Sequence, residues 1–98
     1  MGYITINMIQ DGEVHQYQFL FGEFVDDNWS AKLFDDYGEL IKKYNSDSLT
    51  ACFEDLIDSL PEYGLVKSVS ATAAEKTFLS LFENKLRSRI LIYRFSYN

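Results

Sequence analysis

The dipeptide Asp11-Gly12 is the feature that most restricts the fold of this chain. Apolar residues occupy every second position on both sides of it, namely Ile4, Ile6 and Met8 before it and Tyr17, Phe19 and Phe21 after it. Such alternation is typical of strands with one buried face. Asp-Gly favours the type I′ turn, because both central residues of that turn need a positive φ. The sequence therefore predicts an antiparallel hairpin with strands near residues 3–9 and 14–21.

Two apolar stripes with helical spacing follow the hairpin. The first comprises Leu33, Phe34, Tyr37, Leu40, Ile41 and Tyr44, and the second comprises Leu49, Cys52, Phe53, Leu56, Ile57 and Leu60. Apolar residues three and four positions apart lie on one helix face. Ser46 or Asp47 is suited to cap the second helix, and Pro61 is expected to end it. Two consecutive helices are thus predicted in the middle of the chain.

The last third of the chain predicts a strand, a helix and a strand. Leu65, Val66 and Val69 indicate a short third strand. Thr72-Ala-Ala-Glu75 has the capping-box spacing, so a third helix is expected from there to about Arg87. Its predicted buried stripe is Ala74, Phe78, Leu81, Phe82 and Leu86. Residues 90–97 are apolar at both alternating sets of positions, which is typical of a central strand.

These elements predict one α+β domain spanning residues 1–98. The expected order is strand, strand, helix, helix, strand, helix, strand. It corresponds to a two-layer sandwich in which three helices lie on one face of a mostly antiparallel, four-stranded sheet. The start of the chain lacks the features of a secretory signal, and no window is apolar enough for a membrane span. With a single cysteine, Cys52, a reducing and cytoplasmic location is expected.

Catalytic and cofactor motifs are not found in the sequence. The one histidine, His15, lies near the first predicted turn, and Cys52 lies on an apolar helix stripe, so we expect structural roles for both. One histidine and one cysteine are too few for a usual zinc site, and adjacent carboxylates such as Asp35 and Asp36 diverge on a helix. We therefore expect no enzyme activity, no metal and no cofactor.

Charge is distributed unevenly along the chain. The net charge is −6, yet residues 1–62 carry thirteen acids against three lysines, whereas residues 63–98 carry two acids against six basic residues. If the first two helices are neighbours, nine acids can share one surface: Asp26, Asp27, Asp35, Asp36, Glu39, Glu54, Asp55, Asp58 and Glu62. The basic residues near Arg87 and Arg89 are expected to complement a helix end or pair with this excess acid.

An acidic surface of this kind has two interpretations. The acids can be solubilising groups, or they can meet a basic partner, whose opposed potential speeds encounter and sets register. Trp29, between carboxylates, is the predicted aromatic anchor of such an interface. Direct nucleic-acid binding is not expected, because the negative chain would be repelled by phosphate. A monomer or weak homodimer is expected.

In overall profile the chain resembles the bacterial immunity proteins that neutralise polymorphic toxins, including those of contact-dependent growth inhibition. The resemblance lies in small size, acidity, few cysteines and many aromatic residues. It implies a cytoplasmic inhibitor that blocks the active site of a basic toxin domain, often a nuclease, by occlusion.

Three alternatives remain open from the sequence. Phage inhibitors and DNA mimics of nucleic-acid-binding proteins have a similar profile. A small enzyme using carboxylates, with a tyrosine or His15 as proton donor, is a candidate from another class. A structural subunit that self-associates through a strand edge is the third.

Overall fold

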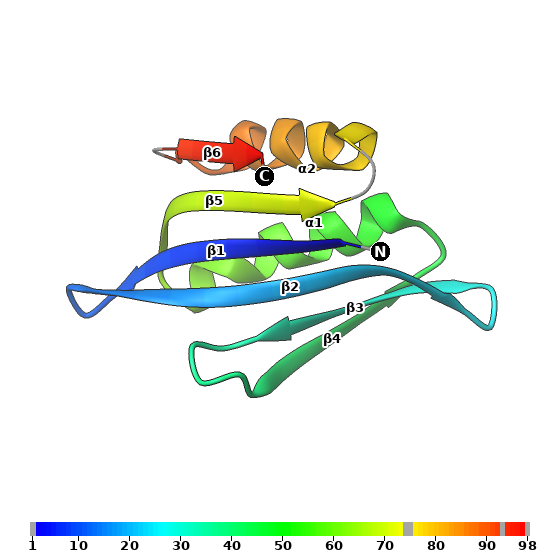
Figure 1. Ribbon diagram of the computed structural model, residues 1–98, viewed down its shortest axis with the longest axis horizontal. Coiled ribbons are helices and arrows are strands. Elements are labelled where there is room, and N and C mark those ends of the chain that lie inside the picture. The colour runs from blue at the N-terminus through cyan, green and yellow to red at the C-terminus, as the bar shows by residue number, and fades with distance from the viewer. Residues whose placement is uncertain (1, 74–75, 93, 98) are drawn as a thin grey trace.

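The computed structural model describes residues 2–73, 76–92 and 94–97. Six strands form one mixed sheet in the order β4-β3-β2-β1-β5-β6, and two α-helices cover one face of it (Figure 1). The elements are β1 (Gly2–Gln10), β2 (Glu13–Val25), β3 (Asn28–Phe34), β4 (Leu40–Ser46), α1 (Leu49–Ser59), the 3-10 helix η1 (Leu60–Glu62), β5 (Leu65–Ala73), α2 (Lys76–Arg89) and β6 (Arg94–Tyr97). The α+β class is confirmed, but the prediction of a four-stranded antiparallel sheet with three helices is wrong.

The first hairpin is confirmed. β1 and β2 pair antiparallel from Gly2↔Phe21 to Gln10↔Glu13, and Asp11 and Gly12 have φ of 51° and 80°. β2 is longer than predicted and continues to Val25.

The first predicted helix is wrong, because its residues form the β3–β4 hairpin. Leu33 and Tyr44 are buried, but they reach the core from two antiparallel strands, whereas Tyr37 is 86% exposed in the turn between them. Gly38 has a φ of +80°, and the Asp35 carboxylate accepts the N–H groups of Tyr37 and Glu39, both at 2.9 Å. A side chain that satisfies local backbone donors in this way stabilises a turn rather than a helix.

The second predicted helix is confirmed as α1. Its cap is Ser48, whose Oγ accepts the N–H of Ala51 at 3.1 Å, rather than Ser46 or Asp47. Pro61 lies within η1, directly after α1 ends. α1 contacts β3, β4 and α2, and its buried stripe contains Phe53, whose ring lies 5.2 Å from both Phe21 and Phe82.

The C-terminal third departs from the prediction in three ways. β5 has nine residues instead of a short run, and Thr72, the predicted helix cap, lies inside it; Ala74 and Glu75 lie outside the described residues. α2 begins at Lys76 and buries Leu79, Phe82 and Leu86. β6 is a four-residue edge strand, parallel to β5, and not a central strand.

The buried apolar residues form one cluster between the helices and the sheet. No helix of the described residues covers the opposite sheet face, which carries polar pairs such as Asn7 with Ser68 and Thr5 with Gln18. In the described part of the chain, no helix is both long enough and apolar enough to cross a membrane.

Candidate functional site

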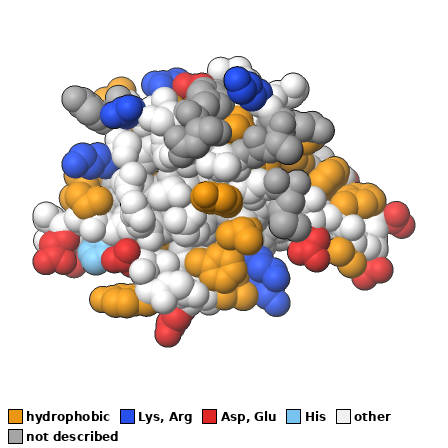
Figure 2. All heavy atoms as spheres, in the orientation of Figure 1, with side chains coloured by type: hydrophobic (Ala, Val, Ile, Leu, Met, Phe, Trp, Pro, Cys, Tyr) orange, Lys and Arg blue, Asp and Glu red, His pale blue; other side chains and the backbone are white. Residues whose placement is uncertain are grey.

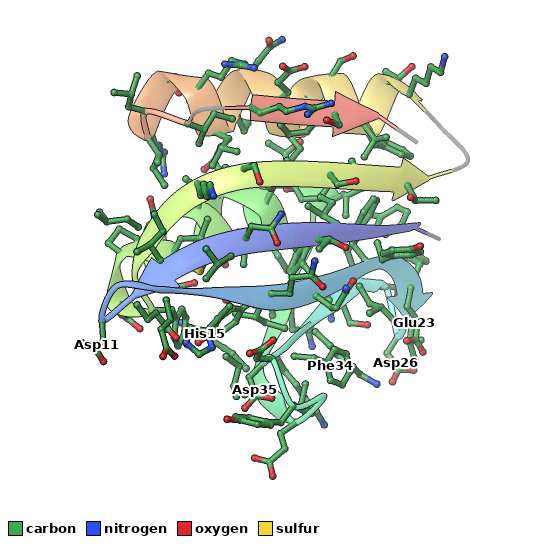
Figure 3. All side chains as sticks on the ribbon, turned by 60° about the vertical axis from the view of Figure 1, so that its left-hand side comes forward. Asp11, His15, Glu23, Asp26, Phe34 and Asp35 are labelled. Carbon is green, nitrogen blue, oxygen red and sulfur yellow. The ribbon has the colours of Figure 1, made fainter. Side chains whose placement is uncertain are left out.

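The nine predicted surface acids do not share one face. Asp26 and Asp27 form the β2–β3 turn, Asp35, Asp36 and Glu39 lie in the β3–β4 turn, and the remaining acids lie on α1 and η1: Glu54, Asp55, Asp58 and Glu62. The two turns lie at opposite ends of β3, whose seven residues span roughly 23 Å. Figure 3 shows Asp26 and Asp35 well apart on the same sheet.

Two of the α1 acids are neutralised by α2. Lys85 Nζ donates to Glu54 Oε1 at 2.6 Å, and the Arg89 guanidinium donates to Asp58. The hydrogen bond from Lys85 lowers the pKa of Glu54. These two pairs join the acidic first part of the chain to its basic last part, so they neutralise part of the charge asymmetry in the sequence. Asp55 and Glu62 instead border a shallow hollow that also contains Lys42 and Lys43.

The carboxylates of the β3–β4 turn have local partners as well. Asp35 bonds the turn backbone, and Asp36 accepts from His15 Nδ1 at 2.9 Å and from the Gln16 N–H at 3.3 Å. The His15 hydrogen bond is the main cause that lowers the pKa of Asp36. The other ring nitrogen, Nε2, lies 3.7 Å from Glu13. Both ring nitrogens of His15 therefore face carboxylates, Nδ1 within hydrogen-bond distance of Asp36 and Nε2 within ion-pair distance of Glu13.

The β2–β3 turn is different, and we define its residues as the acidic tip: Glu23, Phe24, Val25, Asp26, Asp27 and Trp29. Asp26 and Asp27 have φ of 53° and 62°, and Val25 pairs with Asn28, so the connection is a two-residue turn with positive φ at both central positions. Only the backbone of Asp26 is used locally, because Asn28 Nδ2 donates to its carbonyl oxygen at 3.2 Å.

A bulge at Gly22 determines which side chains the acidic tip presents. The register of β2 and β3 shifts between Phe21 and Glu23, and Gly22 has a φ of +98°. The extra residue reverses the alternation of β2, so that Phe24 lies opposite Trp29. Their ring centroids are 5.0 Å apart. The bulge therefore places an aromatic pair on the same side of the sheet as Ala31 and the core.

The acidic tip exposes both apolar and acidic side chains to solvent. Phe24 is 54% exposed, Val25 is similarly exposed, and Trp29 packs against the core with part of its surface free. Glu23, Asp26 and Asp27 are exposed and make no ion pair within the described residues. Figure 2 shows hydrophobic and acidic side chains gathered at the end of the molecule where this hairpin projects.

Sequence reasoning identified Asp26, Asp27 and Trp29 but missed Glu23, Phe24 and Val25. The apolar alternation stops at Phe21, because the bulge moves the next core-side residue from position 23 to position 24. The strand was therefore expected to end at Phe21. The available signal was Gly22, since an isolated glycine within a strand pattern indicates a bulge.

Cys52 and Tyr44 are buried groups whose ionised forms are disfavoured. Burial raises the pKa of the Cys52 thiol, and nearby Asp55 raises it further, so the thiolate is disfavoured. Burial raises the pKa of Tyr44 to about 12, and its hydroxyl bonds Ser59 Oγ at 2.8 Å. In the described ranges, no group of three His, Cys, Asp or Glu residues is arranged to hold one metal ion.

The chain matches no family model, no curated protein and no solved structure. The acidic tip is the candidate functional site of the chain.

Proposed function

We propose that this protein is a non-catalytic inhibitor that neutralises a basic protein partner by inserting the acidic tip into that partner's active-site groove. The partner class that fits best is a toxin nuclease domain, and the protein then acts as an immunity protein. The observation that carries the proposal is the pair Asp26-Asp27, held at positive φ beside the exposed ring of Phe24 and the partly exposed ring of Trp29.

The turn sequence indicates selection for charge over stability. A two-residue turn of this kind favours Asn-Gly, because glycine adopts positive φ without a steric cost. The chain uses that solution at its first hairpin, where Gly12 follows Asp11, but not here. Two adjacent non-glycine residues at positive φ cost free energy, and such local strain is concentrated at functional sites. Like-charge repulsion between the neighbouring carboxylates adds to this cost.

The composition of the acidic tip suits a basic groove. Exposed Phe24 and partly exposed Trp29 provide the kind of aromatic anchor that dominates binding energy at protein interfaces. Asp26 and Asp27 lie in the turn next to these rings, and Glu23, which pairs with Ser30, projects from the opposite side of the sheet. Within the described residues these three carboxylates make no ion pair, so they can pair with lysine or arginine of a partner. Beyond the pair Trp29↔Ser46 the sheet narrows to β2 and β3, which lie roughly 5 Å apart, so the turn that follows can enter a groove that a flat face cannot.

The proposal narrows the contact surface expected from the sequence. Glu54 and Asp58 already pair with α2, and Asp35 and Asp36 already bond the fold, so docking through them would break existing contacts. The same dispersal gives less support to a DNA mimic, which needs carboxylates in a regular row. The arrangement of His15 likewise gives little support to a carboxylate enzyme.

The proposal is tested by comparing two doubly neutralised variants with the wild-type chain. Asp26→Asn with Asp27→Gly removes two charges while keeping the turn geometry, and Asp55→Asn with Glu62→Gln removes two exposed charges on α1 and η1. Each tagged protein captures partners from lysate of the source cells, with elution by a salt gradient. We expect a stoichiometric basic protein with nuclease activity that the first variant loses and the second retains.

Titration of the purified partner completes the test. Wild-type chain should abolish its nuclease activity at one equivalent, and association should slow as salt shortens the Debye length toward roughly 8 Å. Equal affinity of the partner for both variants would place the interface elsewhere. A captured partner that is not basic, or whose activity is unaffected by saturating chain, would overturn the inhibitor proposal.

A further inference from the structure

The sheet is incomplete beside the first part of β5. β6 pairs with β5 only from Ser68↔Arg94 to Ala71↔Tyr97, so Leu65 and Val66 precede the paired region. On their other side they pair with β1, through Leu65↔Ile9 and Val66↔Met8. Within the described residues, no backbone hydrogen bond joins Leu65 or Val66 to the segment 90–92. Among the described residues, the edge of Leu65 and Val66 that faces away from β1 therefore has no strand partner.

A groove of about 830 Å³ occupies this gap. Its lining includes Leu65 and Val66 of β5 together with Ile9, Pro61, Ile90 and Ile92. Leu65 and Leu91 lie at the groove and are 72% and 97% exposed. Two solvent-exposed leucines at the same groove form an apolar surface that a partner can bury.

The backbone at the groove specifies the shape of the occupant. Successive residues of a strand direct their N–H and C=O groups to opposite edges, so part of the backbone of Leu65 and Val66 faces away from β1 and into the gap. An extended peptide added at a strand edge bonds such groups with its own backbone and places alternate side chains in flanking pockets. A compact apolar molecule would contact the apolar lining of the groove but would leave these backbone N–H and C=O groups without hydrogen-bond partners.

The one charged residue among the described lining residues is Lys67, which is exposed. The register between β1 and β5 shifts at this residue, between Asn7 and Met8. An acidic side chain or a terminal carboxylate of the occupant can pair with its ammonium group. The groove thus fits an extended segment with alternating apolar side chains and one acid.

We propose that this groove binds an extended, apolar peptide segment of a partner protein, which adds as a strand at the edge of Leu65 and Val66 that has no strand partner among the described residues. The site is independent of the acidic tip. Ile9 pairs with Val14, whereas the tip begins beyond Phe21, so the two sites lie at opposite ends of β2, roughly 35 Å apart by strand rise. Failure of one proposal leaves the other intact.

The test selects short random peptides, displayed on phage, on the full chain. Enriched peptides are synthesised and their affinities measured by fluorescence polarisation. We expect alternating apolar sequences with one acid, and we expect backbone N-methylation at alternate positions to weaken them by about tenfold or more, because the added strand loses its hydrogen bonds. Amide resonances of Leu65, Val66 and Lys67 should shift on binding in NMR spectra.

Matched variants separate the groove from other surfaces. Leu65→Glu and Leu91→Glu change exposed side chains, so the fold should persist while affinity falls by about tenfold or more. Tyr37→Glu, an equally exposed change in the β3–β4 turn, should have no effect.

Three outcomes would overturn the proposal. They are the absence of any enriched peptide, equal binding of the N-methylated peptides, and insensitivity of the enriched peptides to both leucine variants. A wild-type chain that sediments as a dimer, and that Leu91→Glu converts to a monomer, would assign the groove to a second copy of this chain instead.

Discussion

Two turns of this protein contain the same dipeptide, Asp-Asp, and use it in opposite ways. In the β3–β4 turn, Asp35 accepts two backbone N–H groups and Asp36 accepts from His15 and the backbone of Gln16. In the β2–β3 turn, Asp26 and Asp27 hold positive φ and their carboxylates make no ion pair in the described part of the chain. Identical residue types are thus structural at one end of β3 and available to a partner at the other.

The largest expected difference between the turns is in partner affinity. Phe24→Ala removes the exposed aromatic of the acidic tip and should weaken binding of the captured partner by about thirtyfold, because interface anchors of this type are worth about 2 kcal/mol. Tyr37→Ala removes the exposed aromatic of the other turn and should change affinity less than about twofold. Isothermal titration calorimetry measures both. Equal losses, or a larger loss for Tyr37→Ala, would reverse the assignment of the two turns.

The next effect is on folding stability. Asp35→Ala should lower the free energy of unfolding by about 1–2 kcal/mol, because two turn N–H groups lose their acceptor. Asp35→Asn keeps an oxygen acceptor and should recover most of that loss. At the other turn, Asp27→Asn should stay within about 0.5 kcal/mol of wild type. Urea denaturation monitored by circular dichroism gives all three values, and a loss for Asp27→Asn as large as that for Asp35→Ala would contradict the comparison.

Relief of strain in the acidic tip should stabilise the fold. Asp26→Asn with Asp27→Gly substitutes the sequence that this turn geometry favours, and we expect a gain of about 0.5–1 kcal/mol together with loss of partner binding. The urea midpoint and the calorimetric affinity should therefore move in opposite directions. Asp11→Asn, in the first hairpin, is the matched control and should change neither appreciably. Destabilisation by the double change would mean that the carboxylates are structural.

The smallest expected effect is a pH dependence at Asp36. Its pKa in the folded protein lies below the ordinary value of 3.8, so its stabilising contacts are fully present above that pH and are lost as pH falls through the folded pKa. Urea midpoints of the wild-type chain and Asp36→Asn, measured from pH 2 to pH 6, should therefore converge at the acidic end. A difference that is independent of pH would show that the carboxylate charge of Asp36 contributes nothing.

The parts of the fold that sequence reasoning identified are those with strong local signals. Asp11-Gly12 and its flanking alternation predicted the first hairpin, and the stripe that includes Cys52 and Phe53 predicted α1. Residues 33–44 were wrongly predicted to form a helix, because Leu33 and Tyr44 share a helical spacing by coincidence. In the structure, Gly38 and the hydrogen bonds that the Asp35 side chain accepts from the backbone form a turn there. The candidate site was found only in part, since the bulge at Gly22 concealed Phe24.

The sequence by itself determined the α+β class, the first hairpin, α1 and the presence of excess acid, because turn chemistry and periodicity act over a few residues. Only the tertiary structure decided which acids are free. Lys85 and Arg89 reach Glu54 and Asp58 across thirty-one positions of the chain, and His15 reaches Asp36 across twenty-one. Pairing over such separations depends on how α2 packs beside α1 and on how the β1–β2 and β3–β4 hairpins lie relative to each other, both of which turn at the left of Figure 1. Local sequence patterns do not show which residues lie close together in space. A count of charges therefore could not distinguish a carboxylate that is paired with a basic residue from one that is exposed.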